Sequence, residues 1–170
     1  MKGQFQIYKL TGALQASLIT YDQTDHKTGA VYLEAAKCVD KNNRSYDWKT
    51  KVKFALGASD LFTIFEVIDS GNPEEIKLYH VPAGSAGTRG AKGKRLSMKP
   101  GTDKYEGTWM WTLEDQISES KVMVPLSRGE FRVFIELCRS AMPIIFGWDF
   151  AGSYDTAYQL RALIEENNGD

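Results

Sequence analysis

Residues 121–142 read KVMVPLSRGEFRVFIELCRSAM, and the period of the apolar side chains changes once along this stretch. Up to Leu126 the apolar residues alternate with others, which is the period of a β-strand. Ser127 and Glu130 then form the Ser-x-x-Glu pattern of a helix capping box. Beyond it, apolar residues recur at the spacing of one helical face, namely Phe131, Phe134, Ile135, Cys138 and Met142. The stretch therefore predicts a strand that runs directly into an amphipathic helix, which Pro143 kinks or ends.

The same order of strands and then a helix occurs earlier in the chain. Alternation predicts strands over residues 4–21, 30–39 and 46–57, with a bulge or a close backbone approach at Gly12. Ser59 can cap the helix that follows, and its apolar face consists of Leu61, Ile64, Phe65 and Ile68. More strands are expected over residues 76–81, 94–99 and 107–113. Antiparallel strands followed by a helix, twice over, indicate an α+β domain.

The composition is typical of a globular protein. Of its 170 residues, 42% are hydrophobic and 25% are charged. No apolar run approaches the ~20 residues that cross a membrane, so we expect no membrane association. Residues 1–9 have neither the apolar core of a secretion signal nor the Arg/Ser-rich pattern of a transit peptide. These features predict a cytoplasmic location, or an organellar one if a presequence has been removed.

The sequence offers little for metal binding or catalysis. Cys38 and Cys138 lie in apolar periodic segments, where buried free thiols are expected, and they form no Cys-x-x-Cys pair. His26 and His80 belong to no catalytic or zinc-binding motif. The glycine-rich segment 82–93 is not followed by the Gly-Lys-Ser/Thr of a phosphate-binding loop, and a mobile basic loop is the favoured interpretation. We expect no metal, no cofactor and no enzymatic activity.

The charges are segregated although the net charge is only −1. Residues 77–99 contain six basic residues and no acidic one, and residues 41–53 contain five basic residues and one acid. Residues 100–170 hold twelve acids and six bases. Local basic stretches attract phosphate even when the overall charge is near zero.

Aromatic residues on strands beside these basic residues are what a binder of single strands needs. Bases stack on aromatic side chains at about 1–3 kcal/mol each, while basic side chains follow the phosphates. Most strand aromatics belong to a core, however, and alternate lysines also describe a solvated face. The candidate nucleic-acid-binding residues are Tyr8, Lys9, Trp48, Lys49, Lys51, Lys53, Tyr79, Lys94, Arg95, Trp109 and Trp111.

Two parts of the chain resemble one known family. Tyr46-Asp47-Trp48, running on into the helix from Ser59, is similar to a strand-to-helix motif of the Whirly family of single-stranded-DNA-binding proteins. Gly129-Glu130-Phe131, continuing to Gly147-Trp148, resembles the second helix of that family. The order and approximate spacing match over residues 5–150.

The resemblance implies a single domain over residues 1–150, with two four-stranded antiparallel sheets packed with two helices. It implies that the helices form the core of a homotetramer, and that single strands bind along sheet edges and between subunits with little sequence preference. The implied core and subunit contacts are Leu61, Ile64, Phe65, Phe131, Phe134, Ile135 and Met142. Residues 9–14 match only partly the family's Lys-Gly-Lys-Ala-Ala-Leu motif, which is linked to assembly beyond the tetramer. The tail at 151–170, with a short helix expected over 153–166, has no counterpart.

Three hypotheses for function follow. The leading one is a non-catalytic single-stranded-DNA-binding protein of low sequence specificity that acts in replication, recombination or repair. The alternatives are a module that binds or anneals RNA, and a transcription-regulator or protein-interaction module of the same fold. Trp48 and Trp148 carry the family motifs, so a structural role is favoured for them over stacking. A bacterial or phage origin is plausible because no transit peptide is visible.

Overall fold

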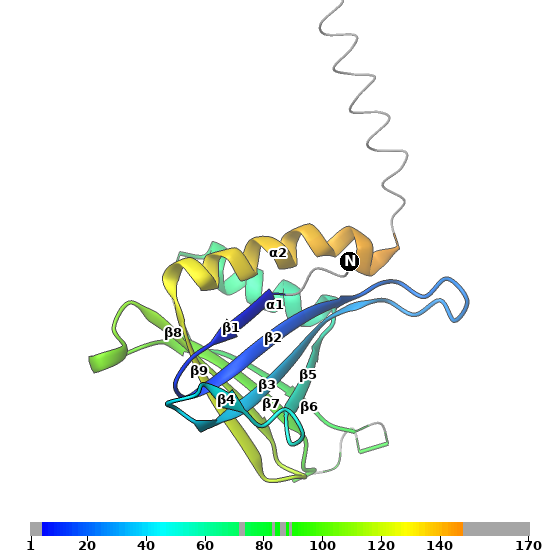
Figure 1. The fold of residues 1–170 in the computed structure, drawn as a ribbon. Coiled ribbons are helices and arrows are strands. Elements are labelled where there is room, and N and C mark those ends of the chain that lie inside the picture. The colour runs from blue at the N-terminus through cyan, green and yellow to red at the C-terminus, as the bar shows by residue number, and fades with distance from the viewer. Residues whose placement is uncertain (1–4, 72–73, 83, 86–87, 89, 148–170) are drawn as a thin grey trace, which may run out of the picture.

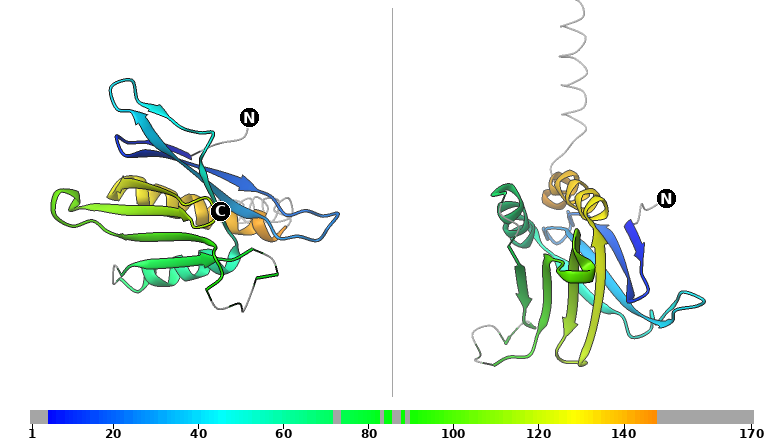
Figure 2. Two further views of the ribbon diagram at one scale, coloured as in Figure 1. Left: turned by 90° about the horizontal axis from the view of Figure 1, so that it is seen from below. Right: turned by 90° about the vertical axis from the view of Figure 1, so that its left-hand side faces the viewer.

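Two antiparallel sheets and two long helices make up the computed structural model, which describes residues 5–71, 74–82, 84, 85, 88 and 90–147 (Figure 1). The helices lie side by side at one end, and the sheets extend away from them (Figure 2). This confirms the expected α+β class and the strands-helix-strands-helix order. Trp148, the tail at 151–170 and the third helix expected over 153–166 lie outside the described residues.

The first sheet has five strands where four were expected. They are β1 (Phe5–Tyr8), β2 (Gly12–Ile19), β3 (Ala30–Asp40), β4 (Ser45–Tyr46) and β5 (Val52–Leu56). Strands β4 and β5 pair with successive parts of the same edge of β3, so together they replace the single strand expected over 46–57. Asp47 causes the break, because its carboxylate accepts hydrogen bonds from the backbone N–H groups of Lys49 at 3.1 Å and Thr50 at 3.3 Å.

The strand expected over 4–21 is a hairpin of β1 and β2. Lys9 and Gly12 exchange backbone hydrogen bonds of 2.9 and 3.2 Å across its turn. The close approach expected at Gly12 is confirmed: a Cβ there would lie 2.8 Å from the carbonyl oxygen of Ala36 and 2.9 Å from Cγ1 of Val122. Glycine at this position therefore lets the first sheet pack closely against the second.

The second sheet is a meander of four strands in chain order. They are β6 (Ile76–His80), β7 (Lys94–Pro100), β8 (Thr108–Asp115) and β9 (Ser120–Ser127). A short 3-10 helix, η1 (Asp103–Tyr105), lies between β7 and β8. Each strand includes most or all of its expected range.

Helix α1 (Ala58–Asp69) begins two residues earlier than a cap at Ser59 would place it. Its N-cap is Gly57 rather than Ser59, because the carboxylate of Asp60 accepts the hydrogen bond of the Gly57 N–H at 2.9 Å. Helix α2 (Arg128–Phe146) has the expected capping box between Ser127 and Glu130. Pro143 lies inside α2, and the helix ends at Gly147, whose left-handed conformation at φ 68° suits glycine.

The core fills the space between the sheets and the helices. Its largest fully buried side chains include Trp111, Phe54 and Phe134. Every residue expected on the inner faces of the helices contributes: Leu61, Ile64, Phe131, Phe134 and Ile135 are buried, and Phe65 and Met142 pack against them half-buried. Of the two free cysteines, Cys138 is buried as expected, but Cys38 is only half-buried.

Candidate nucleic-acid interface

Strand alternation divides the second sheet into an inner apolar face and an outer polar face. Leu96, Trp111 and Val122 point into the core, so their neighbours along each strand point outward. The register aligns the outward residues in rows across the four strands. One row is Tyr79, Arg95, Glu114 and Lys121, and the next is Lys77, Ser97, Thr112 and Met123.

These rows enclose a depression of about 480 Å³, called here the basic depression. Ser97 and Thr112 are its short central side chains, and longer side chains surround them. Its charged lining residues are four cations and two acids, namely Lys77, Arg95, Lys99, Lys121, Glu75 and Glu114. The outer face of the second sheet thus carries excess positive charge although the whole chain does not.

The cations of the basic depression differ in their partners. Lys77 forms an ion pair of 2.8 Å with Glu75, which also accepts a hydrogen bond of 2.7 Å from Ser97. The hydrogen bond from Lys77, together with that from Ser97, lowers the pKa of Glu75 below its ordinary value. Within the described part of the chain, no ion pair joins Arg95, Lys99 or Lys121 to an acid. These three side chains are available for a phosphate.

Tyr79 supplies an aromatic ring at the margin of the basic depression. Tyr79 is 45% exposed, and the guanidinium carbon of Arg95 lies over the ring, 5.2 Å from its centre. The Tyr79 hydroxyl is within hydrogen-bonding reach of the Ala91 carbonyl and lies 3.1 Å from Oε1 of Gln116. A ring held at its hydroxyl loses little freedom when a base stacks on it, so Tyr79 is a suitable stacking platform.

The outer face of the first sheet carries a second group of expected residues. Tyr8 is 48% exposed, and its ring packs against that of Tyr46 with centres 5.4 Å apart. Lys53 is exposed in β5, but Lys51 is half-buried in an ion pair of 2.7 Å with Glu34. Of these residues, Tyr8 and Lys53 are the more accessible to a nucleic acid.

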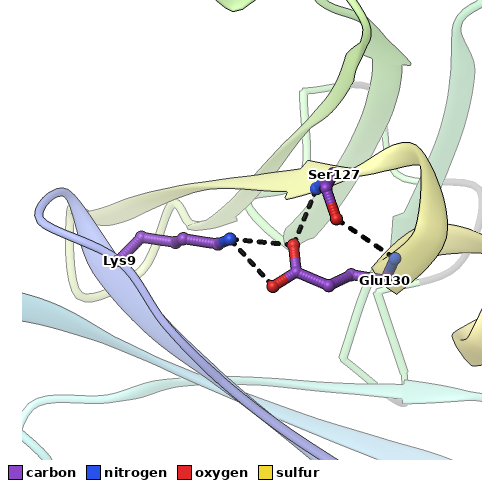
Figure 3. Close-up of polar contacts among 3 residues, drawn as sticks. All are labelled: Lys9, Ser127 and Glu130. Atoms are coloured by element: carbon purple, nitrogen blue, oxygen red, sulfur yellow. Dashed lines mark hydrogen bonds and ion pairs between the residues drawn. The ribbon is translucent and has the colours of Figure 1, made fainter.

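Lys9 has a different role from the one expected. Its Nζ lies 2.8 Å from both carboxylate oxygens of Glu130, as Figure 3 shows. Glu130 also accepts a hydrogen bond of 2.7 Å from the Ser127 N–H. Burial alone would raise the pKa of Glu130, but the hydrogen bonds from Lys9 and Ser127 lower it. Lys9 is therefore engaged at the start of α2 in this structure, and its contact with phosphate stays a prediction.

Both tryptophans of β8 also differ from expectation. Trp111 is fully buried and packs edge-on against Phe134 at 4.7 Å, so no base can reach it. Trp109 is half-buried on the same inner face, and its ring stacks on Phe131 of α2 at 4.2 Å. The expectation that Trp109 and Trp111 share one face of the strand is confirmed, but this face packs against the helices.

Three further expected residues lie away from the basic depression. Lys94 precedes Arg95 and points to the opposite face of the sheet, so it does not line the depression. Trp48 is half-buried and Lys49 is exposed, both in the connection between β4 and β5. Their contact with a nucleic acid stays a prediction.

Sequence reasoning missed the central members of the depression. Lys77 and Lys99 were recognised only as part of a basic stretch, and Lys121, Ser97 and Thr112 were not singled out. The missing information is the register between strands, which aligns residues 7 to 20 positions apart in the chain. Alternation within each strand shows which residues share a face but not their partners on the neighbouring strands.

No group of acids, histidines and cysteines suited to a metal is found among the described residues. His80 lies 3.0 Å from Asp60 and stacks on Phe54, both of which belong to the packing around α1. In the part of the chain that the structure describes, no helix is long and apolar enough to cross a membrane.

Comparison with known proteins identifies relatives of this fold. The mitochondrial single-stranded DNA-binding protein WHY2 of Arabidopsis thaliana is 29% identical over 108 residues, which cover 62% of this chain and 44% of that protein. The chloroplastic single-stranded DNA-binding protein WHY1 of Zea mays is 24% identical over 124 residues, covering 72% of this chain and 45% of that protein. The match thus spans less than half the length of either relative.

Solved structures share the fold. The plant transcriptional regulator PBF-2 superimposes with a TM-score of 0.72 at 21% identity, covering 91% of this chain and 87% of that one. WHY1 from Arabidopsis thaliana gives a TM-score of 0.69 at 22% identity, covering 91% of this chain and 97% of that one. A family model described as Whirly transcription factor matches residues 7–137, from β1 into the middle of α2. The chain that folds into these two sheets and two helices therefore belongs to the Whirly family.

Proposed function

We propose that this protein binds single-stranded DNA without catalysis and with low sequence specificity, in replication, recombination or repair. The observation that carries the proposal is the basic depression, where the exposed ring of Tyr79 lies beside Arg95, Lys99 and Lys121. These cations are free to neutralise phosphates, and the ring offers a stacking surface for a base. A single strand can present both groups at once, whereas the bases of a duplex are already stacked and paired.

The names of the relatives support this proposal. WHY2 and WHY1 are named single-stranded DNA-binding proteins, which favours a binding role over an enzymatic one. They are also named mitochondrial and chloroplastic, so an organellar location is the better proposal, and these relatives give no support to a bacterial or phage origin. A role in transcription is the second candidate, because PBF-2 is named a transcriptional regulator. Binding to RNA stays an open alternative.

We also propose that the protein is a homo-oligomer, most simply a tetramer, assembled through its helices. The helices expose large apolar side chains that the core does not cover, namely Phe62, Val133, Leu137 and Ile144. Exposed apolar patches of this kind mark interaction sites. Size-exclusion chromatography with light scattering tests the proposal, and a monomer at micromolar concentration would contradict it.

The test of DNA binding is fluorescence anisotropy with a labelled strand of about 30 nucleotides at several salt concentrations. A label on the DNA is preferable to tryptophan quenching, because Trp111 is buried and Trp109 stacks on Phe131. We expect tight binding of the single strand, weak binding of the matching duplex, and an affinity that falls steeply with salt. Equal affinity for both DNA forms would refute the single-strand proposal, and a matching RNA strand tests the RNA alternative.

A pair of variants ties the binding to the depression. Arg95→Gln removes a cation that lies beside Tyr79 in the depression. Lys27→Gln is the matched control, because Lys27 is exposed in the turn between β2 and β3 and does not line the depression. Loss of affinity in the first variant alone supports the proposed interface, and equal loss in both would place the binding elsewhere.

A further inference from the structure

We infer that Glu114 makes the basic depression selective among bases, favouring a base with an exocyclic amino group over thymine. The inference rests on the proposed binding of single-stranded DNA and adds a specificity-determining residue to it. The proposed preference concerns only the one base that contacts the depression. A preference at one base is compatible with low specificity over a whole sequence.

Glu114 is the only acid in its row of the outer face among the described residues. It lies directly opposite Arg95 on one neighbouring strand and Lys121 on the other. Residues opposite each other in a sheet have Cβ atoms about 5 Å apart, so both cations are within reach of the carboxylate. Even so, the Glu114 side chain forms no ion pair or hydrogen bond within the described residues, although it is half-buried.

The other acid of the depression shows the contrast. Glu75 is engaged by both Lys77 and Ser97, and this use of its oxygens explains its presence without any ligand. Glu114 has no such internal use. The Glu114 carboxylate keeps open acceptor positions, and it lines the depression, from which a ligand could offer a donor.

The row places the carboxylate where the edge of a base would lie. Tyr79, Arg95 and Glu114 follow one another across three adjacent strands, which are about 4.8 Å apart. The guanidinium of Arg95 lies over the Tyr79 ring, so a base that stacks on this pair can direct an edge along the row toward Glu114. The phosphates remain near Arg95, Lys99 and Lys121, because the carboxylate repels them.

The chemistry of the edge then decides the preference. A carboxylate can only accept hydrogen bonds. Cytosine presents its N4 amino group as a donor, whereas thymine presents the O4 acceptor at the same position and can offer the carboxylate only the single N3–H donor beside it. Thr112, the nearby hydroxyl, donates or accepts and so does not distinguish the two bases.

The test compares 30-nucleotide strands of thymidine and of 5-methylcytidine at pH 8, because these bases differ in the groups of the pairing edge and share the 5-methyl group. In a strand of one base type every register is equivalent, so the position of the protein on the DNA does not matter. The wild-type protein should bind the methylcytidine strand about tenfold more tightly, the lower end of the range expected for one hydrogen bond to a charged acceptor. The readout is the ratio of the two dissociation constants. A change in the protein's charge alters the affinity for both strands by the same factor, so it leaves this ratio unchanged.

Glu114→Gln should bring this ratio close to one, since an amide offers both a donor and an acceptor. Glu106→Gln is the matched control: it removes the same charge from an exposed position that does not line the depression, and it should keep the ratio. A wild-type protein that binds both strands equally would overturn the inference and leave the proposed function intact. A ratio unchanged by Glu114→Gln would also overturn it, and binding of neither strand would refute the proposed function itself.

Discussion

The ion pair between Lys9 and Glu130 is expected to stabilise the fold measurably, and a double-mutant cycle can isolate its contribution. The cycle uses Lys9→Met, Glu130→Gln and the double variant. Glutamine can keep the capping-box hydrogen bond to Ser127, so Glu130→Gln removes the charge without removing the cap. Methionine keeps much of the apolar stem of Lys9.

The geometry sets the size of the effect. The Lys9 ammonium lies 2.8 Å from both oxygens of Glu130, and the two side chains are 27% and 33% exposed. An exposed ion pair contributes about 0–1 kcal/mol, and hydrogen bonds to charged groups contribute about 1.5–3 kcal/mol. Discounting the second range for partial exposure, we expect a coupling of about 1 kcal/mol between the two residues. Glu130→Ala should cost about 1 kcal/mol more, because it also removes the cap.

The pH dependence gives an independent check with a definite sign. The pKa of Glu130 in the folded protein lies below its ordinary value of 4.5. The carboxylate therefore contributes its full stabilisation above about pH 4.5, and this contribution is lost as the pH falls through the lower, folded-state pKa. The wild-type protein should lose stability relative to Glu130→Gln as the pH is lowered from 6 toward 3.

The assay is urea unfolding at fixed protein concentration, because assembly would make stability depend on concentration. A coupling energy below about 0.3 kcal/mol, the usual limit of additivity for independent sites, would refute the stabilising role of the pair. Wild-type and Glu130→Gln curves that stay parallel on acidification would refute the assignment of the pKa.

Four other variants or measurements test separate features. Arg95→Gln should reduce the slope of log Kd against log salt concentration by about 0.7, the value for one lost phosphate contact in a single strand. Gly12→Val should destabilise by about 1–3 kcal/mol in urea unfolding, since its Cβ would lie 2.8 Å from a carbonyl oxygen of β3. Gly129→Ala, where a Cβ meets nothing within 4 Å, should instead stabilise. Burial raises the pKa of Cys138 to about 12, so a thiol reagent should modify it far more slowly than Cys38 until urea is added.

The order of the elements could be predicted because it depends on local signals. The capping box at Ser127 and the change of period after it locate the start of α2 to the residue. The errors arose where a side chain competes with the strand backbone. Asp47 forms a turn with its own backbone neighbours, and this splits an otherwise continuous alternating segment into β4 and β5.

The site was harder to predict because alternation shows that residues share a face but not which face is inside. Trp109 and Trp111 share a face as expected, and that face packs on α2. Lys9 was expected to bind phosphate because it is a lysine beside Tyr8, but its partner Glu130 is 121 positions away in the chain. Contacts of this kind depend on how the two sheets pack, and no local pattern contains them.

Whether a lysine forms an ion pair distinguishes structural lysines from candidate binding lysines better than the number of lysines in a segment does. Lys9 and Lys51 both lie near expected interface residues, yet each is held by an acid within 2.8 Å. Lys99 and Lys121 have no such partner among the described residues, and they line the same depression. A net charge of −1 is therefore compatible with a strongly attractive surface, because many acids neutralise cations elsewhere. It follows that salt should weaken binding mainly through the unpaired cations of the second sheet, while the ion pairs of Lys9 and Lys51 stabilise the fold.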